Sequence, residues 1–310
     1  MARQGAYGQA MSDTTTSPKN EDSLAGFLYA LTAYLLWGFL PLYMKALAHI
    51  SPAEVIAHRV LWSLPIALGV ILFLGRTADL KLALRTPRML AMGAATASLI
   101  SINWGIYVWA IGSGHALDAA LGYYINPLFS VFLGRVLLGE KLRPLQWSAI
   151  ALAAAAVGIL TWDAGQLPVV ALGLTLTWGI YAYLKKSLPI GPNQGFTLEV
   201  ALLAPFALGY VLWLGQQGTG HFAMGDLRNT LLLLGCGIVT AVPLMIYANG
   251  AKGLRLSTIA MMQYIAPTMI FLTAVFVFDE PFGHARAIAF PMIWAALVMF
   301  TTSKIIARRR

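Results

Sequence analysis

Residues 123–127 of this 310-residue chain are YYINP, and residues 263–267 are QYIAP. Each stretch lies inside a long apolar run, where proline is unexpected. Proline has no amide hydrogen and its ring crowds the carbonyl four residues earlier, so it bends or breaks a helix. Because the same pattern occurs twice, 140 positions apart, it indicates one structural unit that the chain uses two times.

The composition indicates a membrane protein. Hydrophobic residues make up 59% of the chain and charged residues 11%, whereas a soluble domain has roughly 25% charged residues. The net charge of +9 comes from residues spread between the apolar segments, with no basic stripe, so we expect a lipid bilayer as partner and no nucleic acid. The single cysteine, Cys236, can form no intramolecular disulfide.

Ten apolar segments are long enough to be helices that cross a bilayer, which takes about 20 residues. They run over 24–46, 53–74, 89–112, 116–137, 146–163, 167–186, 195–214, 230–250, 257–278 and 285–306. The sequence therefore predicts an all-α membrane protein with ten transmembrane helices.

The positions of lysine and arginine predict the orientation, because cytoplasmic loops carry an excess of both. With the N-terminus in the cytoplasm, 17 of these residues lie inside, and only Lys45, Arg228 and Arg286 lie outside. Arg59 lies within a helix. We therefore expect a multi-pass protein with both termini in the cytoplasm.

A shift of 140 or 141 residues superposes one half of the chain on the other. It aligns Trp37 with Trp178, Tyr107 with Tyr247, Tyr124 with Tyr264, Pro127 with Pro267 and Glu140 with Glu280. We predict a disordered cytoplasmic tail over 1–23, five-helix repeats over 24–163 and 164–306, and a basic cytoplasmic tail over 307–310. Since five is odd, the repeats must be inverted, an architecture typical of secondary transporters that bind cargo near the midplane.

The prolines predict helix kinks and a polar path. Kinks are expected at Pro41, Pro127, Pro243 and Pro267. Pro127 frees the carbonyl of Tyr123, and an orphan carbonyl in hydrocarbon needs a partner. Tyr123 and Asn126 share a helix face. This face either satisfies its own polar atoms within a kinked helix or lines the path of a cargo.

Other polar and aromatic residues are predicted at a similar depth, where packing is the alternative role for each. The candidate substrate-binding residues are Trp37, Arg59, Asn103, Tyr107, Tyr123, Asn126, Trp178, Tyr247, Gln263 and Tyr264.

Arg59 is the most distinctive candidate, because an arginine inside a spanning helix costs roughly 2.5–3.5 kcal/mol at its centre. Glu54 and His58 lie one turn or less away, and Glu54 could offset the charge. A structural ion pair or snorkelling is one explanation; an anion contact or an outer gate is the other. Glu199 aligns with Arg59 but falls near the inner end of its helix, so Glu54, His58 and Glu199 are gating or ion-pair candidates.

No catalytic, metal-binding or cofactor-binding set is expected. The five histidines are scattered near helix ends, no nucleotide-binding loop GxxxxGK[ST] occurs, and no carboxylate lies at the centre of a segment. We therefore expect no enzyme and no cofactor.

The stretches AYLLWGFLPLYMK (33–45) and SPAEVIAHRVLWSLP (51–65) resemble the RarD-type permeases, EamA-like members of the drug/metabolite transporter superfamily. NWGIYVWAI (103–111) and ALGYYINPLFSVFLG (120–134) are similar to the same family. The resemblance implies ten helices in inverted repeats, a bacterial inner membrane and a transport role.

The sequence and the resemblance together favour a secondary transporter that exports a small organic metabolite or drug-like solute by alternating access. An importer or exchanger of amino-acid-like metabolites is the alternative within transport. A structural or regulatory membrane protein that moves no solute is the alternative of another class. A homodimer stays open as the oligomeric state.

Overall fold

The structure, a computed structural model, describes residues 23–139, 141–250, 254 and 256–308. The predicted N-terminal tail up to residue 22, the repeat residue Glu140 and the last two residues of the basic tail lie outside the described residues. Within these residues all regular secondary structure is helical.

The helices follow one another with short connections. They are α1 (Leu24–Ala46), α2 (Pro52–Phe73), α3 (Ala78–Arg85), α4 (Pro87–Gly112), α5 (Ala116–Leu138), α6 (Pro144–Ala164), α7 (Val169–Ser187), α8 (Pro192–Gln217), α9 (Leu227–Gly250), α10 (Leu256–Met262), α11 (Ile265–Phe276) and α12 (His284–Arg308).

Eight of the described helices are long and apolar enough to cross a membrane, and α7 and α11 contain shorter apolar stretches over Val169–Lys185 and Ile265–Phe276. The prediction of an all-α membrane protein is confirmed at this level. The predicted segments coincide with these helices to within a few residues at most ends; α1 covers the predicted 24–46.

Two details differ from the prediction. The loop expected before residue 89 contains the short helix α3, whose Leu80 and Ala83 are buried beside Met89 and Leu198. The segment expected as one helix over 257–278 is broken at residues 263–264 into α10 and α11. The break lies just before Pro267, whose ring cannot fit against the carbonyl of Gln263 in a continuous helix.

Local sequence signals set the helix ends. The Ser51 hydroxyl accepts a hydrogen bond from the Glu54 amide at 3.3 Å, and Pro52 fills the first position of α2, where no amide hydrogen is needed. Gly139, Gly165 and Gly218 end α5, α6 and α8 with left-handed backbone angles that glycine adopts at little cost.

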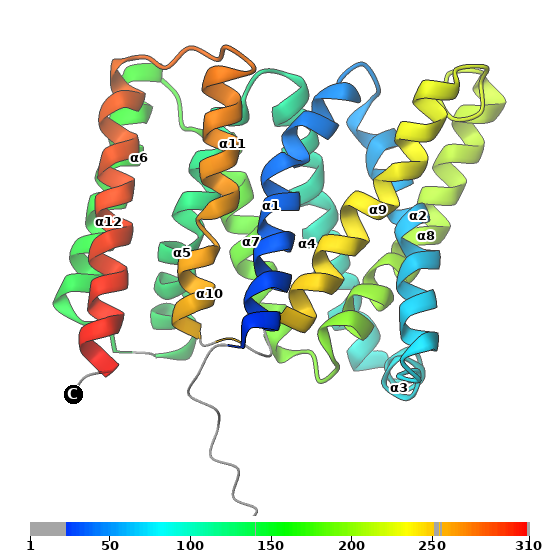
Figure 1. Cartoon of the computed structure of the whole chain (residues 1–310), viewed down its shortest axis with the longest axis horizontal. Helices are drawn as coiled ribbons and strands as arrows, with labels where there is room; N and C mark the ends of the chain where they lie inside the picture. The colour runs from blue at the N-terminus through cyan, green and yellow to red at the C-terminus, as the bar shows by residue number, and fades with distance from the viewer. Residues whose placement is uncertain (1–22, 140, 251–253, 255, 309–310) are drawn as a thin grey trace, which may run out of the picture.

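Several long helices, such as α1, α6 and α12, stand upright in Figure 1, whereas α9 crosses the bundle obliquely. The first residues of α1 and the end of α12 lie at the same, lower end of the bundle. The helix contacts follow a pattern. α1 packs against α9 and α11, while α7 packs against α4 and α5. α2 contacts α8 and α9, α8 also contacts α4, α5 contacts α11, and α6 contacts α12.

Small residues allow the closest helix contacts. A Cβ atom on Gly237 of α9 would lie 2.4 Å from the backbone carbon of Trp62 in α2, and one on Gly122 of α5 would lie 2.8 Å from the carbonyl oxygen of Ala171 in α7. Close backbone approach at small residues is how helices pack within a bilayer. These contacts hold α9 closely against α2 and α5 closely against α7.

Candidate functional site

Five predicted site residues lie in the interior of the bundle: Arg59, Tyr107 and Tyr123 are near one another, and Asn103 and Asn126 lie within about one turn of Tyr107 and Tyr123 on the same helices. We call Arg59, Asn103, Tyr107, Tyr123 and Asn126 the central polar cluster; α2, α4 and α5 supply its members. Arg59 is only 3% exposed, Asn103 1% and Asn126 7%. The rings of Tyr107 and Tyr123 lie 5.9 Å apart between centroids.

The members of the cluster also lie at a similar depth. α2 and α5 begin, and α4 ends, at the upper end of the bundle in Figure 1. Each cluster residue is about 8–15 Å along its helix from that end, at 1.5 Å per residue. A layer of polar groups at this depth is expensive in hydrocarbon unless the groups face each other or a bound solute.

The Arg59 guanidinium is held on two sides. Its Nε donates a hydrogen bond to Oγ1 of Thr240 in α9 at 3.0 Å, and its central carbon lies 4.5 Å from the centroid of the Trp104 ring. Its charge also interacts through space with the hydroxyls of Tyr107 and Tyr123. Its Nη1, however, is buried without a hydrogen-bond partner.

Three more polar atoms of the cluster are buried without a partner: the Tyr107 hydroxyl, Asn103 Oδ1 and Asn126 Oδ1. The other side of the Asn103 amide is occupied, since Nδ2 donates to the Leu174 carbonyl at 3.1 Å and to Thr177 Oγ1 at 2.8 Å. Each such unpaired polar group costs about 1–3 kcal/mol, and a charged group costs more. Buried polar groups of this kind need hydrogen-bond partners, which either water or a polar solute can supply.

Glu54 does not pair with Arg59, although the sequence allowed such an ion pair. Its Oε1 accepts from the His221 amide at 2.7 Å, and its Oε2 contacts His221 Nδ1 at 2.8 Å. The carboxylate is 2% exposed, and both oxygens are directed to the loop between α8 and α9. The charge of Arg59 is thus not offset by this neighbour.

We call the contacts between the start of α2 and the α8–α9 loop the upper clasp. Besides Glu54 and His221, it contains His58, which accepts a hydrogen bond from Trp62 Nε1 at 3.0 Å and packs 4.8 Å from the Phe222 ring. His49 and Asn229 add a side-chain hydrogen bond of 2.8 Å nearby. The clasp joins helices of the first half to a loop of the second half.

We expect His221→Ala to loosen the upper clasp. The substitution removes the ring contact with Glu54 but keeps the backbone hydrogen bond, a loss of about 1–2 kcal/mol. If the clasp closes the upper end, the open population rises roughly 5–30-fold. The measurement is the labelling rate of a cysteine placed at Asn126, in a Cys236→Ala background, by an impermeant maleimide. His284→Ala is the control, and equal rates in both variants contradict the role of the clasp.

Two aromatic candidates form a separate group. Trp37 and Tyr247 lie with Tyr34 in a triangle of rings whose centroids are all 5.5 Å apart, and this triangle joins α1 to α9. Trp178 of α7 lies 5.6 Å from Tyr181 and packs on the hydrophobic cluster that includes Trp104. Trp178 therefore packs against the same cluster as the Trp104 ring, whereas the triangle belongs to a different packing cluster.

Glu199 lies 140 residues after Arg59 in the chain and has different partners. Its Oε1 is 2.5 Å from Lys185 Nζ, and its Oε2 accepts from the Tyr181 hydroxyl at 3.3 Å. The carboxylate is 1% exposed. Glu199 and Arg59 are therefore separate charged sites, and each has a tyrosine near it.

The proline candidates fall into two groups. Pro41, Pro127 and Pro243 lie inside α1, α5 and α9, whereas Pro267 is the third residue of α11. Gln263 and Tyr264 therefore occupy the break between α10 and α11 and not a helix face. The first turn of α11, just after this break, is held to α5 by a hydrogen bond of 2.7 Å between the hydroxyls of Tyr124 and Thr268.

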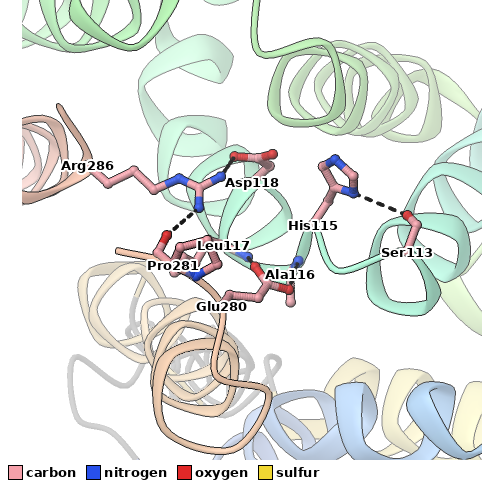
Figure 2. A network of polar contacts seen from close by, with 8 residues as sticks. All are labelled: Ser113, His115, Ala116, Leu117, Asp118, Glu280, Pro281 and Arg286. Atoms are coloured by element: carbon pink, nitrogen blue, oxygen red, sulfur yellow. Dashed lines mark hydrogen bonds and ion pairs between the residues drawn. The ribbon is translucent and has the colours of Figure 1, made fainter. Parts of the chain in front are cut away.

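The upper end of α5 is fixed by the loop between α11 and α12 (Figure 2). The two carboxylate oxygens of Glu280 accept hydrogen bonds from the backbone amides of Ala116 at 2.6 Å and Leu117 at 2.9 Å. Beside them, Arg286 Nη2 lies 3.1 Å from Asp118 Oδ1. These contacts position α5, which carries Tyr123 and Asn126, against the second half.

Comparisons with known proteins agree with this architecture. The sequence pattern of the EamA-like transporter family matches residues 24–162. An uncharacterized transporter of Vibrio cholerae is 42% identical over 286 residues, which cover 92% of this chain and 94% of the relative. The chain belongs to the EamA-like transporter family. As a family member with these helices, it is a multi-pass membrane protein and a membrane permease.

Other members of the EamA-like family are named RarD. Protein RarD of Streptomyces exfoliatus is 40% identical over 92% of this chain and 90% of its own length. Chloramphenicol-sensitive protein RarD of Pseudomonas aeruginosa is 31% identical over 88% and 92%. A solved crystal structure with 22% sequence identity superposes with a TM-score of 0.57 over 92% of this chain and 98% of its own, which supports the fold alone. The resemblance to RarD-type permeases is confirmed.

Sequence reasoning missed several partners in this permease. Thr240 and His221 were not selected, and Trp104 was noted only as part of the family-like segment. A threonine in an apolar helix and a histidine in a loop belong to no sequence motif that would mark them as site residues. Their roles follow from the contact of α2 with α9 and with the α8–α9 loop, and only the fold shows that contact.

Proposed function

We propose that this chain is a secondary transporter of a small organic solute that works by alternating access between two inverted five-helix repeats. The repeats comprise residues 24–163 and 164–306, and ten helices cross the bilayer. The proposed membrane is the bacterial inner membrane, with both termini in the cytoplasm. Export is the proposed direction, and lipid and solute are the only partners that the proposal requires.

The observation that carries the proposal is the exchange pattern of the helix contacts. The repeat equates α1 with α7, α2 with α8, α4 with α9, α5 with α10 and α11, and α6 with α12. Under this exchange the contacts of α1 with α9 and α11 become those of α7 with α4 and α5, which occur as well. The contact of α2 with α9 becomes that of α8 with α4, which also occurs. Such a pattern is expected of two units related by a pseudo-two-fold axis.

The central polar cluster lies where the two repeats meet. Arg59 of the first repeat bonds Thr240 of the second, and Asn103 of the first bonds Leu174 and Thr177 of the second. The upper clasp and the Glu280 contacts also cross between the repeats. A solute held at such a boundary changes its exposure when one repeat moves against the other.

Topology labelling tests the inversion. We expect single cysteines at Ala48, after α1, and at Ser187, near the end of α7, to react from opposite sides of the membrane in a Cys236→Ala background. An impermeant maleimide applied to intact cells and to inverted vesicles reads the two sides. Labelling of both positions from the same side contradicts the inverted repeat.

Alternating access is tested at Asn126, which is 7% exposed. We expect a cysteine at this position to react with impermeant reagents from both sides, because it faces each side in turn. A membrane protein with a purely structural or regulatory role predicts labelling from one side or from neither, and that result would reject transport. Inverted vesicles loaded with solute then decide between export and import.

A further inference from the structure

A cavity of about 370 Å³ lies at the lower end of the bundle, away from the central polar cluster. We call it the lower cavity. It is enclosed by the connection between α2 and α3, the start of α8 and Ala248 near the end of α9. Its polar lining consists of Arg76, Asp79, Asn193 and Gln194. Ligand sites in proteins begin at about 300 Å³, so this space is large enough for one.

The start of α8 at this cavity lacks the anionic group that the aligned start of α2 has. The 140-residue shift aligns the first turns of the two helices. In α2 the Ser51 hydroxyl caps the helix and Glu54 adds a carboxylate. α8 has Gly191 and Gln194 at these positions, so its first turn contains no side-chain cap and no acid. Because the positive end of a helix favours an anion and its free amides bind one, α8 lacks a negative partner here.

An unpaired side chain lines the same space. Asn193 is only 7% exposed and forms part of the cavity wall. Its backbone carbonyl accepts a hydrogen bond from Thr197 at 2.9 Å, but its side-chain amide has no hydrogen bond within the described ranges. Buried polar groups are ordinarily paired. The Asn193 amide is therefore available, like the helix terminus, to a ligand that enters the cavity.

The charge around the cavity is mainly positive. Four exposed basic residues occur between the end of α2 and the first turn of α4, and none has an ion pair to another described residue: Arg76, Lys81, Arg85 and Arg88. One acid opposes them, Asp79, whose Oδ2 lies 3.5 Å from Gln194 Nε2. Basic clusters that directly follow a spanning helix on the cytoplasmic side attract anionic lipid headgroups.

The apolar surroundings favour a lipid over a soluble phosphate ester. Phe73, three residues before Arg76, is 90% exposed. The short helix α3 buries Leu80 and exposes Leu82 beside its basic residues, as a helix at a bilayer surface does. α3 lies at the lower end of the bundle in Figure 1. A headgroup at Arg76 would therefore have its acyl chains beside Phe73.

We propose that the lower cavity binds the headgroup of an anionic phospholipid, whose phosphodiester accepts hydrogen bonds from Arg76, the Asn193 amide and the first backbone amides of α8. In the proposed orientation this lipid belongs to the cytoplasmic leaflet. The bound headgroup joins the α2–α3 connection of the first half to α8 of the second half, so it stabilises their contact at the lower end. The site is independent of the identity of the cargo.

Lipid titrations on the purified full-length protein in detergent test the site. The probes are phosphatidylglycerol and phosphatidylcholine with the same acyl chains, and soluble glycerophosphoglycerol, which has the headgroup without the chains. Native mass spectrometry counts bound lipids, and heat unfolding measures protection. We expect phosphatidylglycerol to bind at least roughly fivefold more tightly than phosphatidylcholine, the factor for about 1 kcal/mol from one basic residue. Glycerophosphoglycerol at the same concentration should give no protection.

Variants assign the binding to the lower cavity. Arg76→Gln should weaken phosphatidylglycerol binding roughly fivefold or more without unfolding the protein, because Arg76 is exposed. Gln194→Glu supplies the carboxylate that α2 has at the aligned position, so it should abolish the preference for the anionic lipid. Asp79→Asn removes the acid from the cavity wall and should tighten binding. Lys141→Gln, at an exposed lysine between α5 and α6, is the control with the same change of charge.

Four outcomes overturn the proposal. They are equal binding of the two lipids, equal affinities in Arg76→Gln and Lys141→Gln, an unchanged lipid preference in Gln194→Glu, and protection by glycerophosphoglycerol as strong as that by the lipid. The last result would identify a soluble phosphate ester as the ligand. Because these measurements need no flux, they stand or fall separately from the transport function, which the labelling of position 126 tests.

Discussion

Gly237→Val is expected to destabilise the protein by about 3 kcal/mol or more and to abolish solute movement. A Cβ atom at this position would lie 2.4 Å from both the carbon and the oxygen of the Trp62 carbonyl, and 2.6 Å from the Trp62 Cβ. Overpacking costs about 1–3 kcal/mol even where side chains can shift. Here the obstacle is the backbone of α2, so the two helices must separate.

Separation of α2 from α9 also disturbs the central polar cluster. Thr240 lies one turn after Gly237 and accepts the hydrogen bond from Arg59, so an outward shift of α9 breaks this contact. The Ser63 hydroxyl, which donates to the Gly237 carbonyl at 3.5 Å, is affected as well. Both stability and solute binding should therefore fall together.

The control for Gly237→Val is Gly209→Ala in α8. No atom lies within 4 Å of a Cβ at Gly209, and alanine favours a helix over glycine by up to about 1 kcal/mol. We expect this control to be as stable as the wild type or slightly more stable. Unfolding in detergent, followed by heat or by added SDS, measures both variants. Equal stability of Gly237→Val and Gly209→Ala would disprove the close contact.

The long helices are the part of the fold that the sequence predicts best. Apolar runs of about 20 residues have few alternatives to a spanning helix, so length and composition were sufficient for α1, α4 and α9. The short helix α3 was missed because its eight residues are amphipathic and carry charges, as a polar loop does. The break before α11 was predicted only as a kink, since proline alone does not determine whether the chain bends or stops.

The sequence predicts only some features of the candidate site. A polar residue in an apolar helix is easily recognised as a candidate, because it needs a partner inside the membrane. Arg59, Asn103 and Asn126 are predicted on this ground. The sequence could not decide which of them meet. Tyr247 aligns with Tyr107 in the repeat, yet it packs with Trp37 and Tyr34 and not in the central polar cluster. Local spacing gives the face of a helix, whereas the partner of that face depends on tertiary packing.

Glu280→Ala is the second change with a large expected effect, a loss of about 3–5 kcal/mol of stability. The first residue before α5, His115, provides no side-chain cap, and Glu280 from the α11–α12 loop takes that role with both oxygens. Hydrogen bonds to a charged group contribute about 1.5–3 kcal/mol each. The carboxylate also lies at the positive end of the α5 dipole, and it is only 6% exposed.

Glu280→Gln separates the two contributions. Its amide oxygen still accepts one backbone hydrogen bond, but its NH₂ group faces the second amide, so we expect roughly half the loss. The control is Arg286→Gln, which removes the neighbouring and more exposed ion pair with Asp118 and the hydrogen bond from Arg286 to the Pro281 carbonyl, both seen in Figure 2. Exposed ion pairs contribute at most about 1 kcal/mol, so this variant should remain close to the wild type. If both substitutions at Glu280 prove as mild as Arg286→Gln in detergent unfolding, the carboxylate does not anchor α5, and the link between the two repeats at this end must lie elsewhere.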